Sequence, residues 1–183
     1  MKHEIKTASE EYLKVIKEDF KKYKLLGDKT FAQIEDKDIH FESDDEANSI
    51  AVIIQHLSGN MSSRFTEFLT TDGEKPARNR DLEFEDQNMT KDDLIKKWES
   101  GWNILFNSIN NLNADDLTKT IHIRNEPHSV IQALNRQVTH CAYHVGQIVL
   151  IAKQIKKSDW NTLSIAKKKS EEYNEKMFSK ETK

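Results

Sequence analysis

The sequence contains little of the material from which β-rich or disulfide-linked proteins are built. Its 183 residues include only five glycines, two prolines and one cysteine, Cys141. So few glycines and prolines cannot supply the many tight turns of an all-β sandwich, and long helices are expected instead. A single cysteine excludes an intramolecular disulfide and predicts a reducing compartment. We expect Cys141 to pack in the core as a small apolar side chain.

An excess of charge of one sign and long apolar runs are also missing. Lys and Arg total 28 against 31 Asp and Glu, a formal net charge of −3, which excludes the strong positive field of a dedicated nucleic-acid-binding protein. The longest apolar stretches, residues 50–54 and 145–152, fall well short of the ~20 residues of a transmembrane helix. Met1-Lys2-His3-Glu4 is too polar to begin a signal peptide. We therefore expect a cytoplasmic protein that binds neither nucleic acid nor a membrane.

Hydrophobic periodicity divides the chain into four segments with helical spacing. These segments are residues 5–26, 50–68, 94–112 and 130–155. Each spans roughly 20–25 residues, or about 30–37 Å of helix. Four amphipathic helices of similar length predict an all-α protein with the architecture of a four-helix bundle. The chain length predicts a single domain over residues 1–183, with a C-terminal tail from about residue 160.

The boundaries of these segments carry their own signals. Gly27 follows the first segment, where we expect it to cap the helix C-terminus. The stretch Ser43-Asp44-Asp45-Glu46 precedes the second, and its acidic residues suit the positive end of a helix dipole. Thr90 opens the third in a sequence close to a capping box, and the fourth begins after Pro127. Before the fourth, the alternating stretch Thr120-Ile121-His122-Ile123-Arg124 predicts a short strand or hairpin.

The seven histidines fall into two groups by position. Four lie at the terminus, in connections or at a helix start, and we expect them to be exposed or locally bonded: His3, His40, His122 and His128. His140 and His144 lie four residues apart in the most apolar segment, so they project from one helix face. His56 lies in the middle of the second segment, on an edge formed by small residues.

Two imidazoles at positions i and i+4 of a helix can reach one metal ion, so His140 and His144 have a metal-ligand spacing. The spacing alone is weak evidence, because the glutamate of the zincin motif is absent between them. Hydrogen-bonded structural histidines are the alternative, and for His56 on its own that interpretation is favoured. The paired Glu-x-x-His motifs of ferritin-like di-iron proteins are also absent.

Four further polar residues accompany these histidines. Asn60 and Arg64 follow His56 by one and two helical turns, and Arg136 precedes the histidine pair by one turn. Two arginines near one site would suit an anionic substrate, although ion pairs with surface acids explain them equally well. Tyr143 and Asn60 are candidate hydrogen-bond donors beside a bound metal ion.

Several stretches resemble a known superfamily. Gln55-His56-Leu57-Ser58-Gly59-Asn60-Met61 and His140-Cys141-Ala142-Tyr143-His144-Val145-Gly146-Gln147-Ile148 resemble the DinB-like superfamily of metal-dependent proteins. Three shorter stretches are similar, more narrowly, to an uncharacterised bacterial branch of it: Asp72-Gly73-Glu74-Lys75-Pro76, Asn79-Arg80-Asp81 and Trp160-Asn161-Thr162-Leu163-Ser164-Ile165. The resemblance extends over nearly the whole chain, from about Tyr12 to Asn174.

The resemblance implies an up-down-down-up four-helix bundle with a divalent metal ion held by three histidines. One comes from the second helix and two from the fourth, which implies His56, His140 and His144 as ligands here. Imidazole ligands suit Zn, Ni or Fe, and the sequence does not choose among these metals. Some members of the superfamily are thiol transferases that use bacillithiol, mycothiol or glutathione, and others have no known activity.

The leading hypothesis from the sequence is a metal-dependent S-transferase that joins a low-molecular-weight thiol of the bacillithiol type to a small electrophile. Three histidines leave a coordination position where a thiolate could bind. A metal hydroxide there would instead make the protein a hydrolase. The rival from another class is a non-catalytic, stress-related metal-binding module. Arg64 and Arg136 would bind anionic substrate groups.

We also expect a homodimer that forms through helix faces. The resemblance implies this assembly. Trp98 and Trp102 support it because they share one face of the third segment, where a small bundle has room for only two deeply buried indoles.

Overall fold

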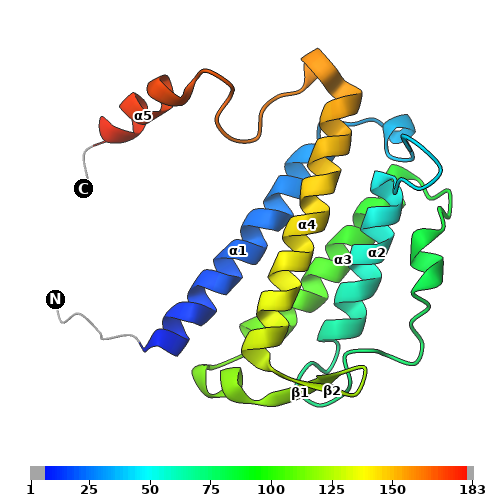
Figure 1. Ribbon diagram of the computed structural model, residues 1–183, viewed down its shortest axis with the longest axis vertical. Helices are drawn as coiled ribbons and strands as arrows, with labels where there is room; N and C mark the ends of the chain where they lie inside the picture. The colour runs from blue at the N-terminus through cyan, green and yellow to red at the C-terminus, as the bar shows by residue number, and fades with distance from the viewer. Residues whose placement is uncertain (1–6, 181–183) are drawn as a thin grey trace.

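The computed structural model describes residues 7–180, so His3 and Ile5 lie outside the described residues. Within that range the chain is mostly helical, with five α-helices and one two-stranded sheet (Figure 1). The helices are α1 Ala8–Phe31, α2 Ile50–Phe65, α3 Lys91–Asn110, α4 Val130–Lys156 and α5 Ser170–Phe178. Four short 3-10 helices lie between them: η1 Asp36–Asp38, η2 Asp81–Phe84, η3 Ala114–Thr118 and η4 Lys157–Asp159.

The four long helices lie side by side, with α1 and α4 running in one direction and α2 and α3 in the other (Figure 1). Tyr12, near the start of α1, donates a hydrogen bond to Asn135 near the start of α4. Because α2 and α3 run the same way, residues 66–90 must return along the length of the molecule between them. That connection carries η2 past α2.

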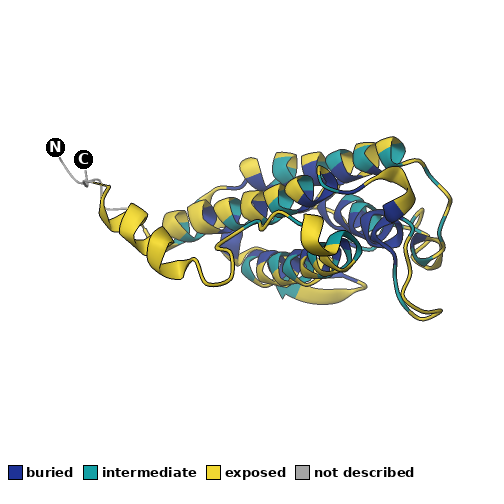
Figure 2. Ribbon diagram, turned by 90° about the horizontal axis from the view of Figure 1, so that it is seen from above, coloured by how far each residue is buried: buried dark blue, intermediate teal, exposed yellow. Residues whose placement is uncertain are grey.

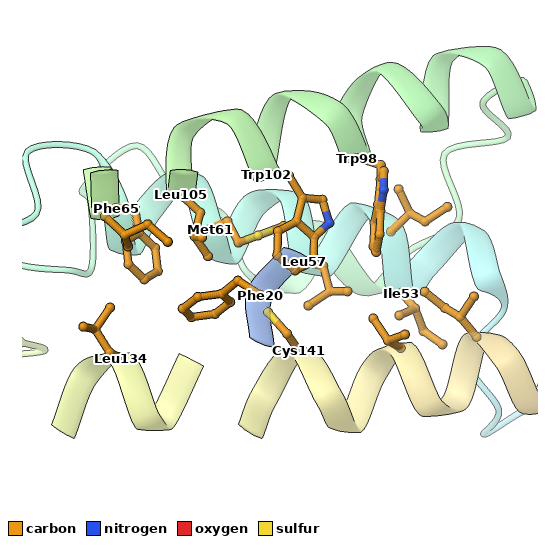
Figure 3. Packing of buried hydrophobic residues seen from close by; sticks show 14 of the residues in the cluster. Phe20, Ile53, Leu57, Met61, Phe65, Trp98, Trp102, Leu105, Leu134 and Cys141 are labelled. Atoms are coloured by element: carbon orange, nitrogen blue, oxygen red, sulfur yellow. The ribbon is translucent and has the colours of Figure 1, made fainter. Parts of the chain in front are cut away.

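The core lies between the long helices and is built around Trp98, Trp102 and Phe20, whose side chains have no exposed area (Figure 3). Cys141 joins this core as predicted, and burial raises the pKa of its thiol to about 12. Figure 2 shows the buried residues on the inner faces of the long helices, whereas α5 is exposed along its whole length. The sequence predicts only a tail in this region, whereas the structure has the helix α5 there. No helix within residues 7–180 combines the length and apolar character needed to cross a membrane.

Two boundary predictions are wrong. α1 does not end at Gly27 but continues to Phe31, with Ala32 as its C-cap. Gly27 is instead buried inside the helix, where a Cβ would collide with the indole of Trp98. Asp44, Asp45 and Glu46 precede α2 but lie in the connection, and no acidic residue lies in the first turn of this helix. Ser49 caps it instead, by accepting a hydrogen bond from the backbone N–H of Val52.

Other boundaries are confirmed. Thr90 caps α3 by accepting a hydrogen bond from the backbone N–H of Asp93 at 3.3 Å. The expected hairpin is formed by β1 Thr120–Ile123 and β2 Glu126–Ser129, which pair antiparallel before α4 begins. The hairpin lies at the end of the molecule where α2 ends and α4 begins, next to the connection that follows α2 (Figure 1).

Candidate metal centre

The structure brings His56 of α2 together with His140 and His144 of α4. One ring nitrogen from each histidine lies within 4.8 Å of the other two. Nε2 of His56 is 3.1 Å from Nε2 of His140. Two ligands bound at ~2.0–2.1 Å with tetrahedral geometry would be about 3.4 Å apart, so this spacing suits a shared metal ion. His56 and His144 are buried and His140 is half-buried. The cluster is therefore able to hold a metal ion.

A carboxylate fixes the tautomer of His56. Nδ1 of His56 lies 2.9 Å from Oε2 of Glu83, a residue of η2. Burial raises the pKa of Glu83, but hydrogen bonds from Arg78 and His56 outweigh burial and lower it overall. An ionised carboxylate only accepts hydrogen bonds, so Nδ1 of His56 carries the proton and Nε2 presents its lone pair to the cluster. This carboxylate–histidine arrangement commonly orients metal ligands.

Glu83 is itself held by a buried ion pair. Arg78 donates two hydrogen bonds to it, Nε to Oε1 at 2.7 Å and Nη2 to Oε2 at 2.8 Å. This two-point geometry fixes the plane of the carboxylate. Gly59, one turn after His56 on α2, makes room for the pair, because a Cβ there would overlap the Glu83 carboxylate. The small residue beside His56 therefore has a steric function.

The two histidines of α4 have different surroundings. Nδ1 of His144 lies 2.8 Å from Oε1 of Gln147, so its proton has an acceptor and Nε2 is free to bind a metal ion. Nδ1 of His140 is buried and has no hydrogen-bond partner among residues 7–180. His140 therefore interacts with the cluster through Nε2, which lies 3.1 Å from Nε2 of His56.

The environment keeps both histidines neutral. Burial, the largest cause, together with the unfavourable electrostatic influence of the neighbouring histidines and of Arg78 and Arg64, lowers the pKa of His140 to about 3. Burial is also the main cause that lowers the pKa of His144 to about 4. A neutral imidazole is the form that binds a metal ion, so no proton has to leave these two rings at neutral pH.

A pocket of ≈ 420 Å³ opens beside the cluster and is lined by His56 and His140. All four additional candidates from the sequence line it as well: Asn60, Arg64, Arg136 and Tyr143. The aromatic rings of Phe65 and Phe68 form an apolar part of its wall and stack with centroids 4.9 Å apart. The histidine cluster therefore faces a space large enough for a small molecule.

The four candidates are held differently. Arg64 is buried and donates hydrogen bonds to the backbone oxygen of Gly73 and to Glu74, so it supports the pocket wall. Asn60 is 8% exposed, and its Oδ1 has no hydrogen-bond partner among the described residues. Arg136 is exposed and forms no ion pair with an acid of residues 7–180. Tyr143 is 64% exposed.

Glu83 and Arg78, which support His56 from the connection between α2 and α3, were not predicted from the sequence. Neither residue lies in a periodic segment, and Glu83 is 27 positions away from His56. No spacing rule links such residues. The contact between Gln147 and His144 could have been predicted from the sequence, because Gln147 follows His144 by three positions on one helix face. Of the other described histidines, only His122 is exposed as predicted. His40 is half-buried and hydrogen-bonds to Asp86 and Met89, which lie more than 40 positions away, and His128 is half-buried with no partner for its Nε2 among the described residues.

Comparison with known proteins gives a family but no activity. No curated protein matches the chain. The family model described as "Protein of unknown function (DUF1572)" matches residues 7–169. This match includes the three clustered histidines, Glu83 and Arg78, together with the four long helices. The chain therefore belongs to the DUF1572 family.

Proposed function

We propose that this protein is a metal-dependent enzyme that binds one divalent ion, Zn, Ni or Fe, through His56, His140 and His144. The observation that carries the proposal is the cluster of three imidazoles next to a pocket. Within residues 7–180 no fourth His, Cys, Asp or Glu joins the cluster. Structural metal sites usually have four protein ligands, whereas catalytic sites keep one position open. The donor set therefore favours catalysis over a non-catalytic, stress-related module.

The reaction that we propose is the transfer of a low-molecular-weight thiol, of the bacillithiol type, to a small electrophile. When bound, the ion supplies a positive charge that keeps a substrate thiol deprotonated at neutral pH. The thiolate sulfur forms a bond to an electrophilic carbon, the leaving group departs with its bonding electrons, and the thiol proton goes to solvent. Cys141 cannot provide the sulfur, because it is fully buried and its pKa is raised to about 12.

In this proposal, residues around the cluster either orient the metal ligands or bind the substrate. Glu83 and Gln147 hold the Nδ1 protons of His56 and His144, which keeps both Nε2 lone pairs available. Arg136, exposed and without an acidic partner in the described chain, binds an anionic group of the substrate, and Arg64 adds positive charge from the wall. Tyr143 and Asn60 are hydrogen-bond donors at the pocket.

Hydrolysis is the second candidate reaction. A water molecule in the open position would become a hydroxide nucleophile near neutral pH. Neutral imidazoles leave the positive charge of the ion uncompensated, which favours this chemistry as much as thiol activation. The apolar wall formed by Phe65 and Phe68 suits an organic electrophile and is the reason that we place thiol transfer first.

We also propose the up-down-down-up four-helix bundle of the DinB-like superfamily as the architecture, in a single domain. The directions of α1 to α4 and the long return between α2 and α3 support this proposal (Figure 1). Homodimerisation stays a prediction. Trp98 and Trp102 are fully buried within one chain, so a dimer would need another surface.

The proposed function can be tested by metal analysis combined with thiol conjugation. We expect about one ion per chain in the wild type and in His122→Ala, whose histidine is exposed and outside the cluster. His140→Ala should lose the ion but keep its helical circular dichroism, because the apolar core holds the fold. Stoichiometric metal in folded His140→Ala would contradict the ligand assignment.

Turnover is then measured with bacillithiol, mycothiol and glutathione against a fluorogenic alkylating electrophile. We expect one thiol to be conjugated by the metal-loaded wild type and by His122→Ala, but not by His140→Ala. Activity should disappear on chelation and return when the ion is added back. A loaded protein that conjugates none of the thiols but hydrolyses ester or amide substrates would make it a hydrolase instead.

A further inference from the structure

The arginines of this protein are concentrated in one place. Of its 28 basic residues only five are arginines, and all five line the pocket beside the histidine cluster: Arg64, Arg78, Arg80, Arg124 and Arg136. None of the lysines lines it. The five arginines come from α2, the connection after α2, the tip of the hairpin and α4. Side chains from four separate parts of the chain therefore place guanidinium groups around one cavity.

The positive charges in this arginine pocket are only partly neutralised. Arg78 is paired with Glu83, and Glu74 is shared by Arg64 at 3.0 Å, Arg124 at 3.1 Å and Arg78 at 3.4 Å. Two carboxylates, those of Glu74 and Glu83, thus form ion pairs with three arginines. Among residues 7–180, no acidic side chain lines the pocket itself.

The remaining two arginines have no carboxylate partner among the described ion pairs. The guanidinium of Arg80 lies 4.7 Å from the ring centroid of Phe84, and Arg136 projects from α4. Five arginines against the carboxylates of Glu74 and Glu83 leave a surplus of about three positive charges, or about two when the ionised Asp72 beside the hairpin tip is counted, because guanidinium groups stay protonated in proteins. A ligand with two or three negative charges would balance that surplus.

The tip of the hairpin is fixed so that Arg124 faces the pocket. Arg124 and Asn125 have φ of 55° and 63°, as the tight turn requires. The carboxylate of Asp72 accepts hydrogen bonds from their backbone N–H groups at 2.9 and 2.7 Å. The backbone N–H of Glu74, which contributes most, acts with these two bonds to lower the pKa of Asp72 to about 2, so the carboxylate is ionised at neutral pH. The pocket wall is thus organised before any ligand binds.

We propose that the arginine pocket binds a small molecule that carries at least two carboxylate or phosphate groups. Arginine is suited to this task because its planar fork binds such groups at two points, whereas lysine acts as a point charge. A volume of ≈ 420 Å³ suits a metabolite-sized ligand. The identification of this ligand as the acidic part of the enzyme's substrate rests on the proposed function, whereas the binding of anions does not need the metal ion.

The proposal is tested by calorimetric titration of the metal-free, full-length protein. The probes are succinate, inorganic pyrophosphate and the neutral analogue succinamide. We expect at least one of the two anions to bind, more weakly as salt increases, and succinamide not to bind. Tighter binding of succinate would identify carboxylates as the recognised groups, and tighter binding of pyrophosphate would identify phosphates.

Arg136→Gln is the variant that tests the arginine pocket. This side chain has no acidic partner among the described ion pairs, so its loss leaves the internal ion pairs intact. It should weaken anion binding about tenfold, the effect of losing one hydrogen-bonded charge. Lys153→Gln, which removes an exposed charge from the same helix, should leave binding unchanged. Equal weakening by both variants, or no binding of either anion at about 10 mM, would overturn the proposal.

The two proposals can fail separately. Anion binding by a protein that never takes up a metal ion would leave the arginine pocket in place and remove the proposed metal chemistry. A metal-loaded, active protein that binds neither anion in its metal-free form would keep the enzyme and remove the anion site.

Discussion

The two faces of α2 are both buried, but against opposite kinds of surface. On one face, Leu57 and Met61 pack beside Trp102 of α3 in a contact that is apolar except for the buried Nε1 of Trp102, which has no partner among the described residues (Figure 3). On the other, His56 meets the histidines of α4 and the carboxylate of Glu83, and Arg64 meets the connection that follows the helix. One short helix therefore carries both the centre of the core and the centre of the candidate site.

The two faces of α2 differ in how specifically their neighbours must be placed. Apolar side chains need only to be covered, and many arrangements of neighbours can cover them. Each buried polar group needs a specific partner at a specific distance, because an unpaired one costs about 1–3 kcal/mol. The apolar face should therefore determine whether the protein folds, and the polar face whether it binds a ligand. Substitutions on the two sides should separate these effects.

The largest effect on stability is expected from the apolar face. Trp102→Ala removes a fully buried indole and should lower the free energy of unfolding by about 3–5 kcal/mol. Urea denaturation followed by circular dichroism measures the change. Trp160→Ala, at a half-buried indole beyond α4, should cost much less. Where Trp102→Ala does not fold, Trp102→Phe should give a smaller loss in the same direction. A change below about 1 kcal/mol in Trp102→Ala would show that this face does not carry the fold.

The same contrast explains how far the sequence could predict this molecule. Helical periodicity identified α1 to α4, and alternation identified the hairpin, because apolar burial repeats along each element. Gly27 was misassigned because a glycine at a helix end and a glycine under an indole look alike in sequence. The short α5, exposed on all sides, has no buried face that periodicity could detect.

The candidate site, like the fold, was predictable only where its residues lie on periodic helices. His140 and His144 are related by helical spacing, and the resemblance added His56. Glu83 and Arg78 could not be found, because the connection after α2 has no repeating pattern and its position depends on the whole fold. Arg64 was predicted as a substrate-binding residue, a role that is untested; in the structure it also bonds to Glu74 and supports the wall.

A smaller effect is expected from the polar face, and it should appear in binding rather than in folding. Glu83→Gln keeps the size of the side chain but removes the charge that holds the Nδ1 proton of His56. Loss of such a partner typically weakens metal binding roughly 10–100-fold. Competition with a chromophoric chelator measures the affinity. Glu85→Gln, two positions further on and exposed, is the matched control and should bind as the wild type. An unchanged affinity in Glu83→Gln would mean that the carboxylate does not orient the ligand.

The smallest effect concerns the pH dependence of the metal-free protein. In the folded state the pKa of His140 is about 3 and that of His144 about 4, chiefly because of burial, whereas histidines in the unfolded chain titrate near ~6.5. Between these values the unfolded state binds more protons than the folded state. The free energy of unfolding should therefore be highest above about pH 6.5 and fall as the pH decreases, by at most about 1.4 kcal/mol per pH unit for each histidine.

Urea denaturation of the chelated protein at several values between about pH 7.5 and 5 measures this slope, in a range where most carboxylates stay ionised. A variant with both His140→Gln and His144→Gln should show a shallower slope. An equal slope would mean that both imidazoles titrate normally in the folded state.

The burial of His140 and His144 also changes the pH at which a bound metal ion should be released. Ordinary histidines would lose an ion steeply below about pH 6, but protons compete poorly for two buried rings, so the ion should be retained to a lower pH.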